Sequence, residues 1–191
     1  MSIDAPPPHV DAPASPDADT DEPRAHAIAD AVRAGTDAIA VPAALVDDGT
    51  TVEPTLLQRL KTMVVAERIK LALRGNRESR QLLVRDGNRL VRRFVLQNPR
   101  LTDDEIIALA KNRTIDDEMI REIAAHREWT KKYQVKLALA TNPKTPMVFA
   151  LRFLATLGDR DIRALAKSKN VSATVAAAAK RIVIAKDSSR G

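Results

Sequence analysis

The stretch LATNPKTPMVFALRFL, residues 139–154, contains a helix end, a bend with two prolines and the start of a new helix. Forty-four residues earlier the chain contains VLQNPRLTDDEIIALA, residues 95–110, with an Asn-Pro pair at the matching position. A third copy that lacks the prolines, IKLALRGNRES, occupies residues 69–79. Helix ends and helix starts that recur with similar residues indicate a protein built from repeated short helices.

Each copy carries the same apolar stripe ahead of its asparagine. Counting back from Asn76, Asn98 and Asn142, apolar residues stand seven, four and three positions earlier, and a cation stands six positions earlier. The three apolar positions share one helical face, so each copy is predicted to be a short helix that buries this face. We expect the asparagine to end the helix in a left-handed conformation, and we expect Thr102 and Thr145 to cap the helices that follow.

The pattern from Thr55 onward predicts an all-α fold, a short α-solenoid of stacked helical hairpins. Apolar residues recur at helical spacing, and strand-like alternation is missing. One helix is expected to run from Thr55 to a stop at Gly75-Asn76. The repeat domain is predicted to cover residues 55–186, with a flexible tail at 187–191. The further helices are expected at about 77–86, 88–97, 103–111, 116–125, 130–141, 146–156, 159–168 and 173–186.

Residues 1–54 differ from the rest in composition. They hold eight of the eleven prolines and have eleven acidic residues against two basic ones, a formal charge of −9, which leaves +15 on residues 55–191. Such a segment buries too little apolar surface to offset its ordering entropy, so we predict a disordered acidic leader. Residues 25–41 are the exception, because their apolar pattern predicts either a transient helix or a short helix that orders on a partner.

The motif VKLALATNPKTP, residues 135–146, resembles the repeat of the leucine-rich-repeat-variant family. That repeat has Val-Arg, two apolar positions and then Asn-Pro-x-Thr-Pro, and VRRFVLQNPRLT, residues 91–102, is a second match without the later proline. The family is similar to HEAT-type solenoids, so the resemblance implies short helices stacked into a right-handed superhelix over about residues 60–186. Members can carry an iron–sulfur cluster on cysteines, and this chain has no cysteine.

Composition and motifs predict no enzyme and no cofactor. The absence of cysteine excludes disulfides and thiolate chemistry, and the scattered glycines form no phosphate loop. The acidic triplets at 103–105 and 116–118 stand in the first turns of predicted helices, where the exposed N–H groups stabilise carboxylates. No apolar run reaches the roughly 20 residues needed to span a bilayer. With an N-terminus unlike a signal peptide, a soluble, cytoplasmic protein is expected.

Basic residues at helical spacing are the main functional signal. The candidate partner-binding residues share a face at three- or four-residue spacing or stand at the cation position of the repeat: Lys70, Arg77, Arg80, Arg89, Arg92, Arg93, Lys132 and Lys136. If the repeats stack, three of these cations, Lys70, Arg92 and Lys136, would project from equivalent places. A charge of +15 favours an acidic or polyanionic partner.

These features predict a scaffold or adaptor that binds an acidic partner protein through a basic or concave face. The alternative is a helical-repeat protein that contacts the backbone phosphates of nucleic acid. The acidic leader is a third possible occupant of the basic face. Few aromatic residues, 3% of the chain, disfavour binding by base stacking.

Overall fold

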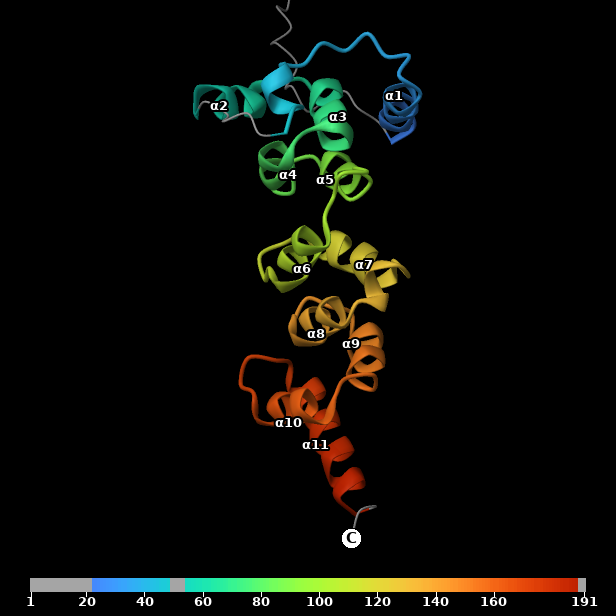
Figure 1. Cartoon of the computed structure of the whole chain (residues 1–191), viewed down its shortest axis with the longest axis vertical. Helices are drawn as coiled ribbons and strands as arrows, with labels where there is room; N and C mark the ends of the chain where they lie inside the picture. Colours follow the sequence, from blue (N-terminus) through green and yellow to red (C-terminus); the bar gives the residue numbers. More distant parts are fainter. Residues whose placement is uncertain (1–21, 49–53, 189–191) are drawn as a thin grey trace, which may run out of the picture. The chain divides into compact units, whose positions relative to one another are not determined.

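The structure, a computed structural model, describes residues 22–48 and 54–188 (Figure 1). Over these residues the chain is all-α, with eleven α-helices, two short 3-10 helices and no strand. The all-α prediction is therefore confirmed. The chain divides into two compact units, Met1–Pro99 and Arg100–Gly191, and each is described by itself.

The first unit is organised around α3, which packs against α1, α4 and α5. Its apolar core includes Ile69, Leu83 and Phe94, all at most 1% exposed. The elements of this unit are α1 (Glu22–Ala34), η1 (Ala43–Leu45), α2 (Pro54–Thr62), α3 (Val65–Arg74), α4 (Arg77–Leu83) and α5 (Arg89–Val95).

The second unit is built from neighbouring short helices, with α8 against both α6 and α9, and α11 against both α9 and α10. Ile120, Leu139 and Leu154 are fully buried in it. Its elements are α6 (Asp103–Lys111), α7 (Asp117–Ala125), η2 (Trp129–Lys131), α8 (Tyr133–Thr141), α9 (Met147–Leu154), α10 (Asp159–Lys167) and α11 (Ala173–Ser188). The last helix thus extends two residues beyond the predicted domain end, and residues 189–191 of the predicted tail lie outside the described part.

The prediction of a single helix from Thr55 to Gly75-Asn76 is wrong, because the helix is interrupted between α2 and α3. Val64 is extended, with φ −65° and ψ 157°, and its N–H donates to the Glu67 carboxylate at 3.1 Å. Met63 closes the preceding turn and is only 6% exposed. A local cap and a buried side chain therefore interrupt a pattern that has helical periodicity throughout.

The predicted leader is corrected for residues 22–48, which form part of the first unit. Helix α1 buries Ala25, Ala29 and Val32, each at most 1% exposed, and packs against α3 and α5. The small side chains allow close approach, and they supply a face that the leader's overall composition does not suggest. Helix α1 therefore packs against its own chain. Residues 1–21 and 49–53 lie outside the described part, so the leader stays a prediction there.

Three buried asparagines, each of which follows a helix, join the chain there to an earlier segment. The Nδ2 of Asn142 donates to the carbonyls of Ala110 and Asn112 at 2.8 and 3.0 Å, at the end of α6. Asn98 and Asn76 act in the same way: Asn98 donates to Ala72 and Gly75 at the end of α3, and Asn76 donates to Ala44 and Asp47 around the end of η1. The carbonyls at a helix end lack partners within the helix, and these amides supply them.

The expectation of a left-handed asparagine is wrong. Asn142 has φ −82° and ψ 121°, and among the described residues only Gly35 has a positive φ. The repeated asparagine is explained by its buried side chain, 4% exposed at Asn142, and by the two carbonyls that it joins.

One of the two predicted threonine caps is confirmed. Thr102 and Glu105 form a reciprocal capping box at the start of α6. Thr145 does not cap α9, because the helix begins after Pro146, whose φ of −54° suits a helix start. The Thr145 hydroxyl is buried and has no hydrogen-bond partner among the described residues.

We expect Asn142→Ala to lower the free energy of unfolding by about 1–3 kcal/mol, because one buried and one partly buried carbonyl lose this donor. Urea denaturation followed by circular dichroism measures this change. The control is Asn170→Ala, since Asn170 is exposed and only its backbone forms hydrogen bonds in the described structure. Equal effects of the two substitutions would contradict the structural role of Asn142.

Thr145→Val is expected to leave stability unchanged or to raise it, because valine keeps the shape and removes an unpaired buried hydroxyl. Thr102→Ala, in contrast, removes a true cap and should cost about 0.5–2 kcal/mol. Thermal denaturation of both variants tests the assignment. A loss at Thr145→Val as large as that at Thr102→Ala would show that Thr145 has a polar partner.

Candidate functional site

Most of the predicted cations in the first unit are bound within the unit itself. The Lys70 ammonium lies 2.7 Å from a carboxylate oxygen of Asp37 and 2.6 Å from the carbonyl of Ile39. This hydrogen bond from Lys70 lowers the pKa of the Asp37 carboxyl. Lys70 therefore anchors the segment that follows α1.

Arg80 and Arg92 have structural roles in the same unit. Arg80 is 3% exposed and donates to the carbonyl of Gly75 at 3.0 Å. Arg92 donates to the carbonyls of Asp86 and Gly87 at 2.6 and 3.1 Å. Both guanidinium groups support backbone carbonyls at chain turns, a use that sequence spacing alone does not distinguish from ligand binding.

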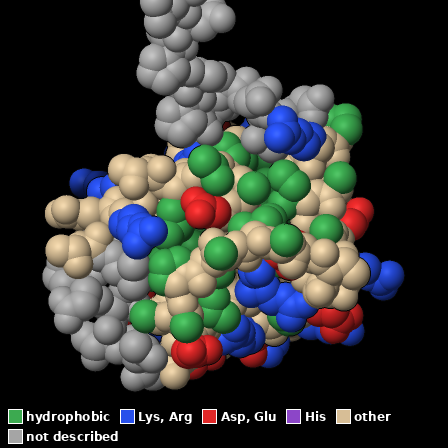
Figure 2. Space-filling view, turned by 90° about the horizontal axis from the view of Figure 1, so that it is seen from above, with side chains coloured by type: hydrophobic (Ala, Val, Ile, Leu, Met, Phe, Trp, Pro, Cys, Tyr) green, Lys and Arg blue, Asp and Glu red, His purple; other side chains and the backbone are tan. Residues whose placement is uncertain are grey.

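Arg89 and Arg93 on α5 face Glu22 at the start of α1, at 3.1 and 3.7 Å. Arg77 lies exposed at the start of α4. On the face seen from above in Figure 2, hydrophobic side chains occupy the middle together with an acidic one, and both basic and acidic side chains lie around them. This face therefore presents mixed charges rather than one basic patch.

The two predicted residues of the second unit have different surroundings. Lys132 forms an exposed ion pair with Asp103. Lys136, half-buried on α8, lines an open cavity of about 360 Å³. Of the eight predicted residues, Lys136 alone lines this cavity.

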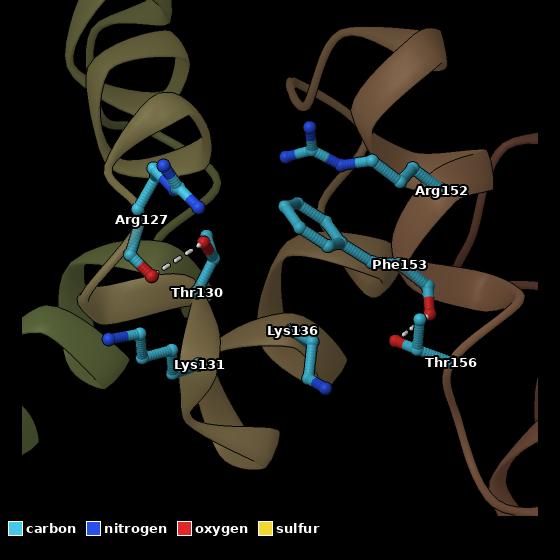
Figure 3. Close-up of a pocket in the computed structure, with 7 residues that line it drawn as sticks. All are labelled: Arg127, Thr130, Lys131, Lys136, Arg152, Phe153 and Thr156. Atoms are coloured by element: carbon cyan, nitrogen blue, oxygen red, sulfur yellow. Dashed lines mark hydrogen bonds between the residues drawn. The ribbon is translucent and has the colours of Figure 1, made fainter.

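The cavity lies among the end of α7, η2, α8 and α9 (Figure 3). Four of its lining residues are cations and none is acidic. The lining residues are Arg127, Thr130, Lys131, Lys136, Arg152, Phe153 and Thr156. In Figure 3 the guanidinium groups of Arg127 and Arg152 extend toward each other across the cavity, and the ring of Phe153 projects between the two sides. We name this site the cationic pocket.

Arg152 is held in place by two aromatic rings. Its guanidinium carbon lies 4.9 Å from the centroid of Phe149 and 5.0 Å from that of Phe153. One nitrogen also donates to the carbonyl of Ala124 at 3.3 Å, which links α9 to the end of α7. Because Phe153 is only 3% exposed, the ring is a fixed platform for the cation.

Arg127 is placed by the turn that follows α7. His126 ends the helix and stacks on Trp129, with the ring centroids 3.8 Å apart. The hydroxyl of Thr130 then donates to the carbonyls of His126 and Arg127, at 2.9 and 3.2 Å. The turn therefore has a defined backbone that directs Arg127 to the cavity.

The four cations differ in their partners. Lys131 pairs with Glu128 at 2.7 Å, and this hydrogen bond lowers the pKa of the Glu128 carboxyl. For Arg127, Lys136 and Arg152, no carboxylate in residues 22–48 and 54–188 lies within ion-pair distance. The Glu128 carboxylate also interacts electrostatically with Arg127, at longer range. The four cations thus exceed the carboxylates paired with them in the described structure, and a bound anion can relieve their remaining repulsion.

Sequence reasoning missed Arg127, Lys131 and Arg152. The one local signal was FALRF, residues 149–153, where an arginine stands three residues after one phenylalanine and directly before another. On a helix this spacing can place a guanidinium near an aromatic ring. The approach of α9 to the end of α7 had no such signal.

Other site types find no support in the described part of the chain. It contains no group of three or more His, Cys, Asp or Glu side chains that could hold a metal ion. None of its helices has the length and apolar character needed to cross a membrane. A second open cavity of about 360 Å³ lies against α6, α8 and α10, and its lining includes both Lys111 and Asp161.

Comparisons with protein-family models, with curated proteins and with solved structures give no match for this chain. The resemblance to the leucine-rich-repeat-variant repeat thus rests on the residues of the motif alone.

The Asp37–Lys70 pair predicts a specific dependence on pH. A carboxyl whose pKa is lowered by folding adds stability above its ordinary pKa of 3.8, and this stability is lost as the pH falls through the lowered value. We expect Asp37→Asn to lower the stability at pH 7 and to flatten the loss of stability below about pH 4. Denaturant midpoints measured from pH 7 to pH 2 test this, with Asp30→Asn at an exposed pair as the control.

Proposed function

We propose that this protein is a non-enzymatic helical-repeat adaptor that binds an acidic group of a partner protein in the cationic pocket. The observation that carries the proposal is one open cavity that is lined by four cations and no acidic residue. Two of these cations, Lys136 and Arg152, form no ion pair in the described structure. The cavity volume of about 360 Å³ lies in the range of ligand sites.

The repeat architecture in this proposal is a short α-solenoid. It is supported by the asparagine contacts, because Asn98 and Asn142 each join the end of their own helix to the end of the helix two before it, α5 to α3 and α8 to α6. Such a contact between equivalent places is what stacked repeats require. The motif resemblance to leucine-rich-repeat variants and HEAT-type proteins agrees with it.

The distribution of the basic side chains that are not bound within the protein favours a protein partner over nucleic acid. Nucleic-acid binding draws its affinity from several phosphate contacts along a backbone. In the first unit, however, Lys70, Arg80 and Arg92 are engaged internally. A single local pocket fits one anionic group better than a row of phosphates.

The test is binding of a fluorescent glutamate-rich peptide to the full chain, measured by anisotropy at several salt concentrations. We expect binding that weakens with salt and an affinity about tenfold lower for Arg127→Gln/Lys136→Gln, which corresponds to about 1.4 kcal/mol.

The matched control is Arg121→Gln/Arg160→Gln, which removes two exposed cations of the second unit that do not line the pocket. We expect this variant to bind as the unmodified protein does. An equal loss in both double variants would show that net charge, rather than the pocket, binds the peptide. Tighter binding of duplex DNA through the same pocket residues would favour the nucleic-acid alternative.

A further inference from the structure

We infer that the cationic pocket recognises a phosphorylated side chain of a partner protein, in preference to a glutamate or aspartate carboxylate. This inference rests on the proposed function and names the chemistry of the bound group. The number of available cations, the fixing of Arg152 and the size of the cavity carry it.

The number of cations exceeds what one carboxylate neutralises. Arg127, Lys136 and Arg152 come from three different segments. Within the described residues Lys136 and Arg152 form no ion pair, and Arg127 interacts only at longer range with Glu128, which pairs with Lys131. A carboxylate carries one charge on two oxygens. A phosphoryl monoester carries a charge of about −1.5 to −2 on three terminal oxygens, so it can accept hydrogen bonds from more than one of these cations.

Arg152 is arranged for this role before any ligand binds. The two phenylalanine rings and the carbonyl of Ala124 fix its guanidinium, and the remaining N–H donors can face the cavity. An arginine fork matches two phosphate oxygens at once. Because the side chain is already ordered, binding costs less conformational entropy than it would with a mobile arginine.

The cavity also accommodates more than an inorganic ion. Its volume of about 360 Å³ leaves room for the carrier side chain, and Phe153 is among the lining residues beside the cations (Figure 3). Thr130 and Thr156 line the same cavity, although their hydroxyls donate to the backbone carbonyls of Arg127 and Phe153, respectively. A phosphate joined to a short aliphatic chain fits this combination of surfaces.

The experiment uses the full chain and three fluorescent peptides of the same neutral sequence, which carry serine, glutamate or phosphoserine at one position. Anisotropy gives the affinities at constant ionic strength. The fluorescence of Trp129, the single tryptophan of the chain, provides a second readout beside the pocket. We expect the phosphoserine peptide to bind at least tenfold more tightly than the glutamate peptide, and the serine peptide to bind weakest.

Arg152→Lys separates charge from geometry, because lysine keeps the positive charge and loses the planar fork. We expect this variant to lose most of the preference for phosphoserine and to bind the glutamate peptide within about threefold of the unmodified protein. Arg160→Lys, an exposed residue outside the pocket, is the control and should change neither affinity. Circular dichroism checks folding, and Lys136→Gln serves as the second pocket variant if Arg152→Lys does not fold.

Each further outcome separates the inference from the proposed function. Equal binding of the phosphoserine and glutamate peptides overturns the phosphoryl inference and leaves the adaptor proposal standing. If neither peptide binds, both fail. Competition by inorganic phosphate at millimolar concentration supports a phosphoryl site, whereas duplex DNA that outcompetes the phosphopeptide in a manner dependent on Arg152 overturns both in favour of nucleic acid.

Discussion

The last carbonyl groups of an α-helix have no donor within the helix, and a chain of short helices creates such groups every few turns. In this protein buried asparagine amides supply the missing donors. Asn142 reaches two carbonyls at the end of α6, and Asn98 reaches two at the end of α3. Each bond joins two residues that are 23–32 positions apart in sequence. The repeated asparagine therefore has a physical cause, because its side chain holds the end of one short helix to the end of an earlier one.

The cationic pocket depends on this packing in the second unit. Helices α8 and α9 lie side by side, and Arg152 of α9 reaches the carbonyl of Ala124 at the end of α7. The turn around His126 and Trp129 brings Arg127 to the same cavity. Like charges near one another are tolerated because the cavity opens to water, where their repulsion is weak. A bound anion would offset this repulsion.

The first unit shows why net charge alone misleads. Its cations satisfy carbonyls, as Arg80 does, or pair with carboxylates of the segment around α1, as Lys70 does with Asp37. The acidic side chains of residues 22–48 thus form ion pairs that hold this segment against the rest of the first unit. Burial of Ala29 and Val32 places the acidic groups opposite their partners. Positive charge that remains available for a ligand is a property of the packed structure.

The sequence by itself determined the all-α class, the Asn-Pro stops and the Thr102 cap, because helical periodicity, proline and capping residues act over three or four neighbours. Lys136 could be singled out by its place in the repeat, but its surroundings could not. Only the tertiary structure decided the docking of α1, the burial of the Thr145 hydroxyl and the meeting of Arg127 with Arg152. These features depend on contacts between segments far apart in the chain, and such contacts leave no local pattern in the residues that make them.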